Sequence, residues 1–248
     1  MKRYYLFVML TIVCTRIWAQ DAGTIHYTET RKLHFNIQGD MPPPPDLPTE
    51  HSLHTVLVFK DGISLYKNDA EQDNFGGMQV EDNGEDRIMM RMQAPDNQTY
   101  YNINENSMVR KQEFMDRVFL IEDKVDATKW KLTGNSKMIL GLPCTEAVST
   151  DTSENVSLWF TAAIPVSSGP GKYVGLPGMV LEVHIDNDEQ VITAVDYSKE
   201  VNGDPLTKPK DGKKVTAEEY NKIVEEKMKE MGFDNGPGGN IMIRIENN

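Results

Sequence analysis

Apolar and β-branched residues along the chain gather in short runs, and several of these runs, among them 23–35, 63–67 and 130–133, alternate apolar with polar positions at least in part. The runs span residues 23–35, 55–59, 63–67, 87–92, 99–103, 107–115, 117–122, 130–133, 137–140, 145–149, 156–161, 179–185 and 191–197. A period of two indicates strands with one face against a core, and the Asp, Asn and Gly residues between the runs indicate turns. The pattern therefore predicts a mainly β protein with an antiparallel sheet.

One segment near the C-terminus has helical periodicity instead. Thr216 and Glu219 have the spacing of a capping box, apolar residues recur at helical intervals after them, and Gly232 follows as the expected C-cap. Only one side of this helix is apolar, which predicts packing against the sheet. We therefore expect a single domain, residues 21–248, with an open or half-barrel-like antiparallel sheet and one C-terminal amphipathic helix.

Two segments interrupt the pattern. Four consecutive prolines lie in segment 39–50, and such a run imposes an extended backbone that cannot join a central strand. Segment 68–86 is rich in Asp, Glu, Asn and Gly. Both are predicted to be loops of the same domain. A shorter break, Gly134-Asn135, is interpreted as a turn between two strands.

The first 20 residues have the features of a secretory signal peptide. Lys2 and Arg3 precede an apolar run, and Ala19 provides a small residue before the expected cleavage beside Gln20. The apolar run is shorter than the roughly 20 residues that span a bilayer, and no later stretch is suitable. We expect an exported protein with no transmembrane segment after cleavage, either periplasmic, associated with the outer membrane or secreted. An uncleaved interfacial anchor is the alternative.

The net charge limits which partners the chain can attract, and the cysteine content limits which disulfides it can form. The chain has 26 Lys and Arg against 38 Asp and Glu, a net charge of −12. A chain this acidic is not attracted to nucleic-acid phosphates, so no nucleic-acid partner is expected. Cys144 is the one cysteine beyond the signal segment, so no internal disulfide can form. We interpret it as a buried small residue, with a metal-ligand or redox role as the alternatives.

Several side chains have metal-ligand chemistry. Glu182, His184 and Asp186 alternate along a predicted strand, so they would share one face and offer an imidazole and two carboxylates to a divalent metal. The spacing alone favours a solvated outer face with one histidine, and the metal set is the alternative. Two histidines, His51 and His54, form a second candidate group. Three methionines, Met89, Met90 and Met92, form a third, because thioethers bind copper(I), although methionine also fills protein cores. The cofactor is therefore unknown: we expect none first, with a divalent metal or copper as the alternatives.

Sequence signatures of the common enzyme classes are absent. The chain has no Gly-x-Ser-x-Gly elbow, no His-Glu-x-x-His helix and no Gly-rich phosphate loop with its lysine. This leaves open a hydrolase without a recognisable motif, in which Cys144 or His184 would be the first residues to test.

Two stretches in the second half resemble a known family. They read Trp130-Lys-Leu-Thr and Lys137-Met-Ile-Leu-Gly-Leu-Pro-Cys144, then Leu158-Trp159-Phe-Thr, Ile164-Pro165 and Gly175-Leu-Pro-Gly-Met-Val-Leu181. Together they resemble the GLPGLI family of exported Bacteroidetes proteins. The resemblance implies a cell-envelope location and supplies no activity.

The motif Gly175, Leu176, Pro177 and Gly178 has a structural interpretation of its own. Proline at the second and glycine at the third position of Leu176–Met179 fit a type II turn that leads into the strand at Met179. Alternatively, Gly175 and Gly178 let a ligand or partner approach the backbone closely.

These observations lead to three functional hypotheses. The first is an exported, non-enzymatic binding or accessory protein of the cell envelope. Its concave sheet would hold an apolar ligand, a peptide or an envelope protein, with Trp130, Trp159, Gly175 and Gly178 as ligand-binding residues. The second is a periplasmic protein that handles copper or zinc. The third is the hydrolase without a recognisable motif.

Overall fold

The computed structural model describes residues 22–33, 35–37, 49–69, 78–80, 88–90, 95–125, 130–152, 155–201, 205–230 and 241–243. The predicted signal peptide, residues 1–20, lies outside this set, so export stays a prediction. Most of the predicted loops 39–50 and 68–86 lie outside it as well. Within the described residues, no helix has the length and apolar character that a membrane crossing requires.

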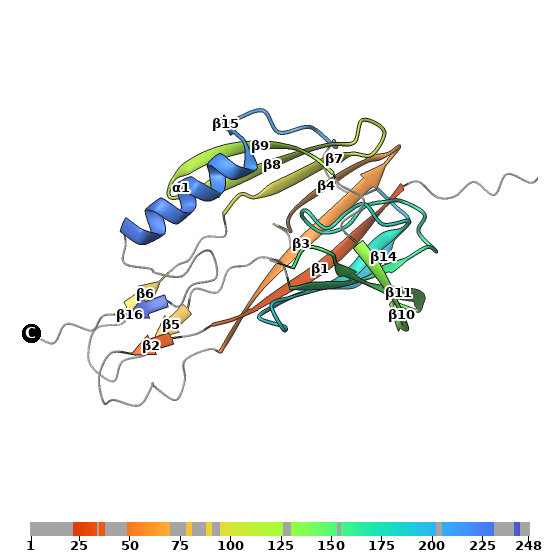
Figure 1. Ribbon diagram of the computed structural model, residues 1–248, viewed down its shortest axis with the longest axis horizontal. Helices are drawn as coiled ribbons and strands as arrows, with labels where there is room; N and C mark the ends of the chain where they lie inside the picture. The colour runs from red at the N-terminus through yellow and green to blue at the C-terminus, as the bar shows by residue number, and fades with distance from the viewer. Residues whose placement is uncertain are drawn as a thin grey trace, which may run out of the picture.

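Twelve strands form one sheet, in the order β10-β11-β12-β13-β14-β1-β3-β4-β7-β8-β9-β15 (Figure 1). Neighbouring strands are antiparallel except β9 and β15, which are parallel. The strands are β1 (Ala22–Lys32), β3 (Glu50–Lys60), β4 (Ile63–Asn68), β7 (Gln98–Asn102), β8 (Ser107–Phe114), β9 (Arg117–Lys124), β10 (Trp130–Ile139), β11 (Leu142–Ser149), β12 (Val156–Thr161), β13 (Met179–Ile185), β14 (Gln190–Ser198) and β15 (Lys213–Val215). The prediction of a mainly β protein with an open, largely antiparallel sheet is confirmed.

Short strands and one helix complete the described elements. Strand β2 (Phe35–Ile37) pairs in parallel with β16 (Ile241–Ile243), and β5 (Met78–Val80) pairs with β6 (Ile88–Met90). Helix α1 (Ala217–Glu230) begins as predicted, because the Thr216 hydroxyl accepts from Glu219 N at 3.1 Å and the Glu219 carboxylate accepts from Thr216 N at 2.9 Å. The helix lies against β9, where Tyr220 meets Phe119 edge to face.

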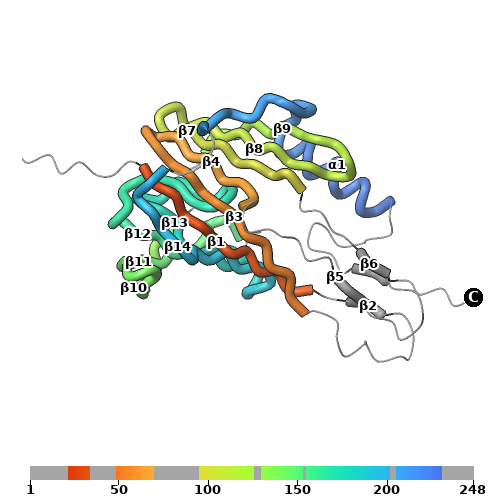
Figure 2. The backbone as a smooth tube through the Cα atoms, turned by 180° about the vertical axis from the view of Figure 1, so that it is seen from behind, coloured from red at the N-terminus to blue at the C-terminus, as the bar shows by residue number. Residues whose placement is uncertain are grey.

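Strands β1 and β3 lie at the centre of the sheet and pair along their whole length. On one side lie β10 to β14, and on the other lie β4, β7, β8, β9 and β15 with helix α1 (Figure 2). Ile25 and Tyr27 of β1 are fully buried, as are Leu57 and Phe59 of β3. The alternation that predicted strand β1 therefore also fixes which of its faces meets the core.

Residues 162–178, which we call the bridging segment, connect β12 to β13 and contact both halves of the sheet. Ser168 Oγ donates to Ser64 Oγ of β4 at 2.7 Å. Trp130 Nε1 of β10 donates to the Val174 carbonyl at 2.9 Å. Strands β4 and β10 are far apart in the order of the sheet. The sheet therefore curls around this segment.

The bridging segment turns at Pro177, but not by the predicted type II turn. Gly178 N donates to the Leu176 carbonyl at 2.8 Å, which closes a three-residue turn. The φ of Gly178 is 158°, whereas a type II turn requires about 80° at that position. The physical reason for glycine is packing: a Cβ at this position would lie 2.2 Å from the Thr161 carbonyl oxygen.

Candidate functional site

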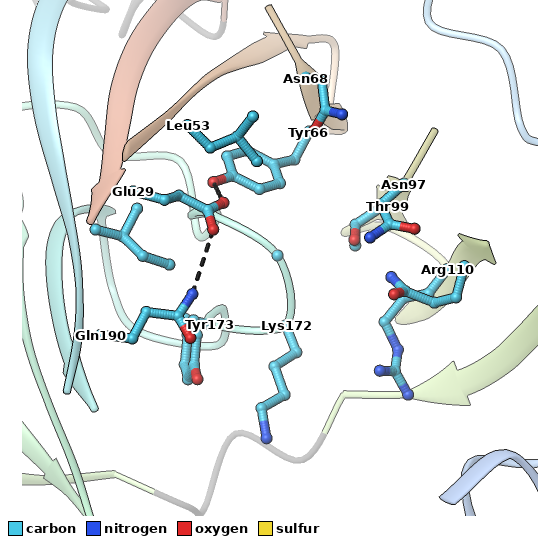
Figure 3. Close-up of a pocket in the computed structure, with 13 residues that line it drawn as sticks. Glu29, Leu53, Tyr66, Asn68, Asn97, Thr99, Arg110, Lys172, Tyr173 and Gln190 are labelled. Carbon is cyan, nitrogen blue, oxygen red and sulfur yellow. Dashed lines mark hydrogen bonds between the residues drawn. The ribbon is translucent and has the colours of Figure 1, made fainter. Parts of the chain in front are cut away.

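A pocket of about 220 Å³ lies beside the bridging segment, between strands of the two halves of the sheet (Figure 3). It is smaller than the roughly 300–1,000 Å³ of pockets that enclose drug-sized ligands. Its size suits one small polar unit at a time. The lining residues come from β1, β3, β4, β7, β8, β14, the bridging segment and one connection: Glu29, Leu53, Tyr66, Asn68, Asn97, Thr99, Arg110, Gln112, Gly171, Lys172, Tyr173, Gln190 and Ile192.

Glu29 is the carboxyl group of this pocket, and its partners fix its position. It follows Ile25 and Tyr27 at intervals of two along β1, so it lies on the face that is buried elsewhere. The Tyr66 hydroxyl donates to Glu29 Oε1, and Gln190 Nε2 donates to Glu29 Oε2 at 3.2 Å. The two oxygens of the carboxylate are therefore held by side chains of β4 and β14.

Burial raises the pKa of Glu29, and this effect outweighs the hydrogen bond from Tyr66, the charge of Arg31 and the hydrogen bond from Gln190, which act in the opposite direction. Burial also raises the pKa of Tyr66, and the charge of Glu29 adds to that shift. Glu29 therefore keeps its proton to a higher pH than an exposed glutamate does. A carboxyl of this kind can donate as well as accept a hydrogen bond, and it suits proton transfer.

The opposite wall of the pocket has amide, hydroxyl and cationic groups. Figure 3 shows Asn97, Thr99 and Arg110 across from Glu29 and Gln190, with Lys172 extending between the two walls. Arg110 Nη2 pairs with Asp123 Oδ2 at 2.8 Å. With so many hydrogen-bonding groups, the lining favours a polar ligand over the apolar ligand expected from the sequence.

The four residues predicted to bind a ligand do not line this pocket. Trp130 donates to the bridging segment and packs against Tyr173, with 6.5 Å between ring centroids. Lys137 Nζ lies 4.3 Å from the centroid of the Trp159 ring. Gly175 and Gly178 are bends of the bridging segment. The structure shows packing roles for these residues, and their role in binding stays a prediction.

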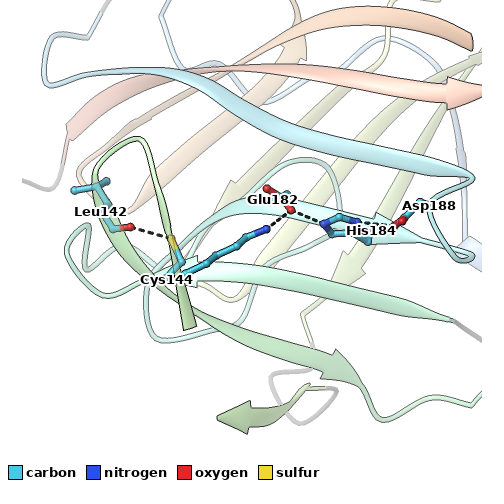
Figure 4. Close-up of polar contacts among 6 residues, drawn as sticks. Leu142, Cys144, Glu182, His184 and Asp188 are labelled. Atoms are coloured by element: carbon cyan, nitrogen blue, oxygen red, sulfur yellow. Dashed lines mark hydrogen bonds and ion pairs between the residues drawn. The ribbon is translucent and has the colours of Figure 1, made fainter. Parts of the chain in front are cut away.

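Of the predicted metal ligands Glu182, His184 and Asp186, Figure 4 shows Glu182 and His184 in contact, with Asp188 on the other side of the His184 ring. His184 Nε2 contacts Glu182, and His184 Nδ1 contacts Asp188 Oδ1 at 2.6 Å. Asp186 lies in the turn that follows β13, where positive φ values end the strand alternation on which the prediction relied. Among the described residues, no three His, Cys, Asp or Glu side chains form a group that could hold a metal ion.

The remaining candidates are Cys144, the histidines of β3 and the methionines near residue 90. Cys144 is buried, its Sγ lies 3.5 Å from the Leu142 carbonyl, and burial raises its pKa, which lowers the reactivity of the thiol. His54 lies 3.5 Å from the Thr28 hydroxyl, and His51 also lies on β3. The side chains of Met89 and Met90 and all of Met92 fall outside the described part.

Sequence reasoning missed the pocket residues Glu29, Tyr66, Arg110, Lys172 and Gln190. One signal was present in the sequence, because Glu29 continues the inward series of Ile25 and Tyr27 with a carboxyl group. A polar residue at an inward position indicates either a buried hydrogen-bond network or a site. The contribution of β14 depends on its pairing with β1 across a long sequence separation, and those of β8 and the bridging segment depend on the curl of the sheet. Local patterns encode neither.

Comparison with known proteins gives one family match and two structural matches. The family model described as "N-glycanase peptide, N-terminal domain" (PNGase F-II N-terminal) matches residues 79–222, more than half of the chain. Two crystal forms of PNGF-II match the fold with TM-scores of 0.54 and 0.53 at 17% identity, and each match covers 82% of this chain. The chain spans about a third of their length, 33% and 32%. No curated protein matches the chain in sequence.

These matches correct two expectations. The assignment to the GLPGLI family is wrong, since the family model that matches is the N-glycanase one. The Gly175–Gly178 motif misled because close packing and a tight turn require glycine and proline in any family. The expectation of a non-enzymatic envelope binding or accessory protein is also wrong, because the matching family is described as the N-terminal domain of an N-glycanase. Of the three hypotheses, the hydrolase agrees best with the match.

Proposed function

Because the chain belongs to the PNGase F-II N-terminal domain family, we propose that it acts in the hydrolysis of N-linked glycans from glycopeptides. In this proposal, the pocket around Glu29 receives a sugar unit of the substrate. The observation that carries the proposal is the pocket itself, in which a carboxyl held by Tyr66 and Gln190 faces amide and hydroxyl groups.

The chemistry of the pocket supports a sugar ligand. A sugar presents a ring of hydroxyl groups, each of which donates and accepts. Asn97, Gln112 and Gln190 provide amides that do both, and Thr99 adds a hydroxyl. Gln190 is oriented, because its Oε1 accepts from Arg31 at 2.9 Å while its Nε2 donates to Glu29. Directed polar groups of this kind give a pocket specificity for a ligand's hydroxyl pattern.

A binding measurement tests the proposal. The full chain is titrated with an N-glycosylated peptide and with the same peptide after enzymatic removal of the glycan, followed by chemical shifts in NMR spectra. Tighter binding of the glycosylated peptide is expected, and equal affinity for the two peptides would overturn the proposal. Mass spectrometry of the same mixtures reports any conversion of the glycosylated asparagine to aspartate.

A matched pair of variants locates the site. Glu29→Gln removes the carboxyl of the pocket. Glu146→Gln makes the same change on β11, where Glu146 also accepts two side-chain hydrogen bonds, from Thr133 and Asn135 at 2.7 Å each, but does not line the pocket. We expect Glu29→Gln to weaken the preference for the glycosylated peptide and Glu146→Gln to leave it unchanged. The reverse result would place the glycan elsewhere on the chain.

A further inference from the structure

The charges that line the pocket differ in sign from the charge of the chain. The chain has a net charge of −12, but two cations, Arg110 and Lys172, line the pocket against one carboxyl, Glu29. The pKa of that carboxyl is raised by burial, so its negative charge weakens at mildly acidic pH before that of an exposed glutamate. The pocket is therefore a cationic position on an acidic protein.

Arg110 has hydrogen-bonding capacity that the protein does not use. A guanidinium has five N–H donors, and Asp123 accepts from Nη2 at 2.8 Å. Within the described residues, the Nε of Arg110 is buried and has no hydrogen-bond acceptor. A buried donor without an acceptor is unfavourable, so an acceptor supplied by a ligand would be favoured at this position. Asp123 offsets part of the arginine charge but does not line the pocket.

The second cation, Lys172, lies on the bridging segment, whereas Arg110 lies on β8. Lys172 follows Gly171, whose φ of 57° turns the chain at this point. The Lys172 ammonium lies 5.7 Å from the centroid of the Tyr173 ring. In Figure 3 both side chains extend away from Glu29, Arg110 from the wall that carries Asn97 and Thr99 and Lys172 from between the two walls. An anionic group at that end of the pocket would meet both cations.

We propose that the pocket selects an acidic sugar unit, whose carboxylate or sulfate group is held by Arg110 and Lys172 while its hydroxyl groups bond the amides and Glu29. This inference rests on the proposed function, since it names the kind of glycan that the site accepts. Arginine suits the planar or tetrahedral oxygen pattern of such anions, and charge-assisted hydrogen bonds are about twice as strong as neutral ones.

Matched pairs of simple sugars test the inference on the full chain. The probes are glucuronic acid against glucose, N-acetylglucosamine 6-sulfate against N-acetylglucosamine, and inorganic sulfate alone. We expect the acidic member of one pair to bind about tenfold more tightly than its neutral partner, because its anionic group adds about one charge-assisted hydrogen bond. The pair that shows the difference identifies the carboxylate or the sulfate as the anion. Equal affinity within both pairs would overturn the inference, as would inorganic sulfate binding as tightly as the sulfated sugar.

Variants assign the effect to the two cations. Lys172→Gln and Arg110→Gln are each expected to reduce the affinity for the acidic sugar to that of its neutral partner. Lys131→Gln, an equal change on an exposed residue of β10 outside the pocket, is expected to have no effect. If the Arg110→Gln variant does not fold because the ion pair with Asp123 is lost, the affinity of Lys172→Gln for the acidic sugar still tests the inference. Unchanged acidic-sugar affinity in Lys172→Gln would overturn the inference.

The two proposals fail separately. A glycosylated peptide that binds in preference to its deglycosylated form, without any advantage for acidic sugars, overturns the acidic-sugar inference and supports the proposed function. Absence of any preference for the glycosylated peptide overturns the proposed function, whatever the simple sugars show.

Discussion

Replacement of Gly178 by alanine tests whether the motif at residues 175–178 exists for packing or for ligand approach. An added Cβ would lie 2.2 Å from the Thr161 carbonyl oxygen and 2.7 Å from its carbon. Both are backbone atoms at the end of β12, so neither can rotate away. The strand or the bridging segment must shift instead.

The expected loss of stability follows from two opposing effects. Overpacking a closely packed site costs about 1–3 kcal/mol, and contact with backbone places Gly178→Ala at the upper end. Alanine also restricts the unfolded chain, which returns about 0.4–1 kcal/mol. We therefore expect a net loss of about 2 kcal/mol, roughly a 30-fold change in the unfolding equilibrium. Urea unfolding monitored by tryptophan fluorescence measures it, with the slope m unchanged.

Gly134→Ala is the control for Gly178→Ala. Gly134 has a φ of 88° and no atom within 4 Å of the added Cβ, so its substitution adds backbone strain without a clash, about 1 kcal/mol. If Gly178→Ala is no less stable than Gly134→Ala, the packing argument fails. Gly178 would then be conformationally replaceable, and ligand approach would become the better explanation for the glycine.

Three further predictions concern the site, the core and the helix. Because burial raises the Glu29 pKa above its ordinary 4.5, Glu29 contributes stability that is fully present below about pH 4.5 and is lost as the pH rises through the folded-state pKa. The free energy of unfolding of Glu29→Gln should therefore rise relative to that of the wild type as the pH increases from 4 to 7. If urea unfolding gives the same difference between the two proteins at every pH in this range, the prediction is refuted. Leu158→Ala, at a fully buried position, should cost about 3 kcal/mol in the same assay; a loss below that of an exposed site would mean that the core is not packed there. Thr216→Ala removes the cap of α1 and should cost about 1 kcal/mol, visible as faster amide exchange in the first turn, with unchanged exchange as the contrary result.

The sequence was sufficient for the elements that depend on local chemistry. Alternation at Ile25 and Tyr27 gave both a strand and its buried face, and the pair Thr216 and Glu219 gave the start of α1. Gly134 shows the limit of local patterns. It was expected to end a strand, but it lies within β10, where a register shift between Leu132 and Ser136 absorbs the irregularity.

The site could not be predicted to the same degree, because its residues meet through strand pairing across long sequence separations and through the curl of the sheet. Glu29 and Gln190 are 161 positions apart in sequence, and Lys172 reaches the pocket from a connection whose path no periodicity specifies. The predicted metal ligands are only partly brought together, for a related reason. The alternation that placed Asp186 beside His184 ends where the turn after β13 begins, so Asp188 takes that position instead.

The central place of β1 has a consequence for how the chain reaches its native state. This strand is the first described one in the sequence, but one of its two neighbours, β14, is among the last, with Thr24 opposite Ser198. During synthesis, β1 can pair with β3 early, while its other edge stays without a partner until most of the chain has emerged. Contacts of such long sequence separation slow folding and leave an unpaired strand edge open to aggregation in the meantime. Slow refolding from urea, with a rate that falls in β14 variants, is the kinetic signature expected of this topology.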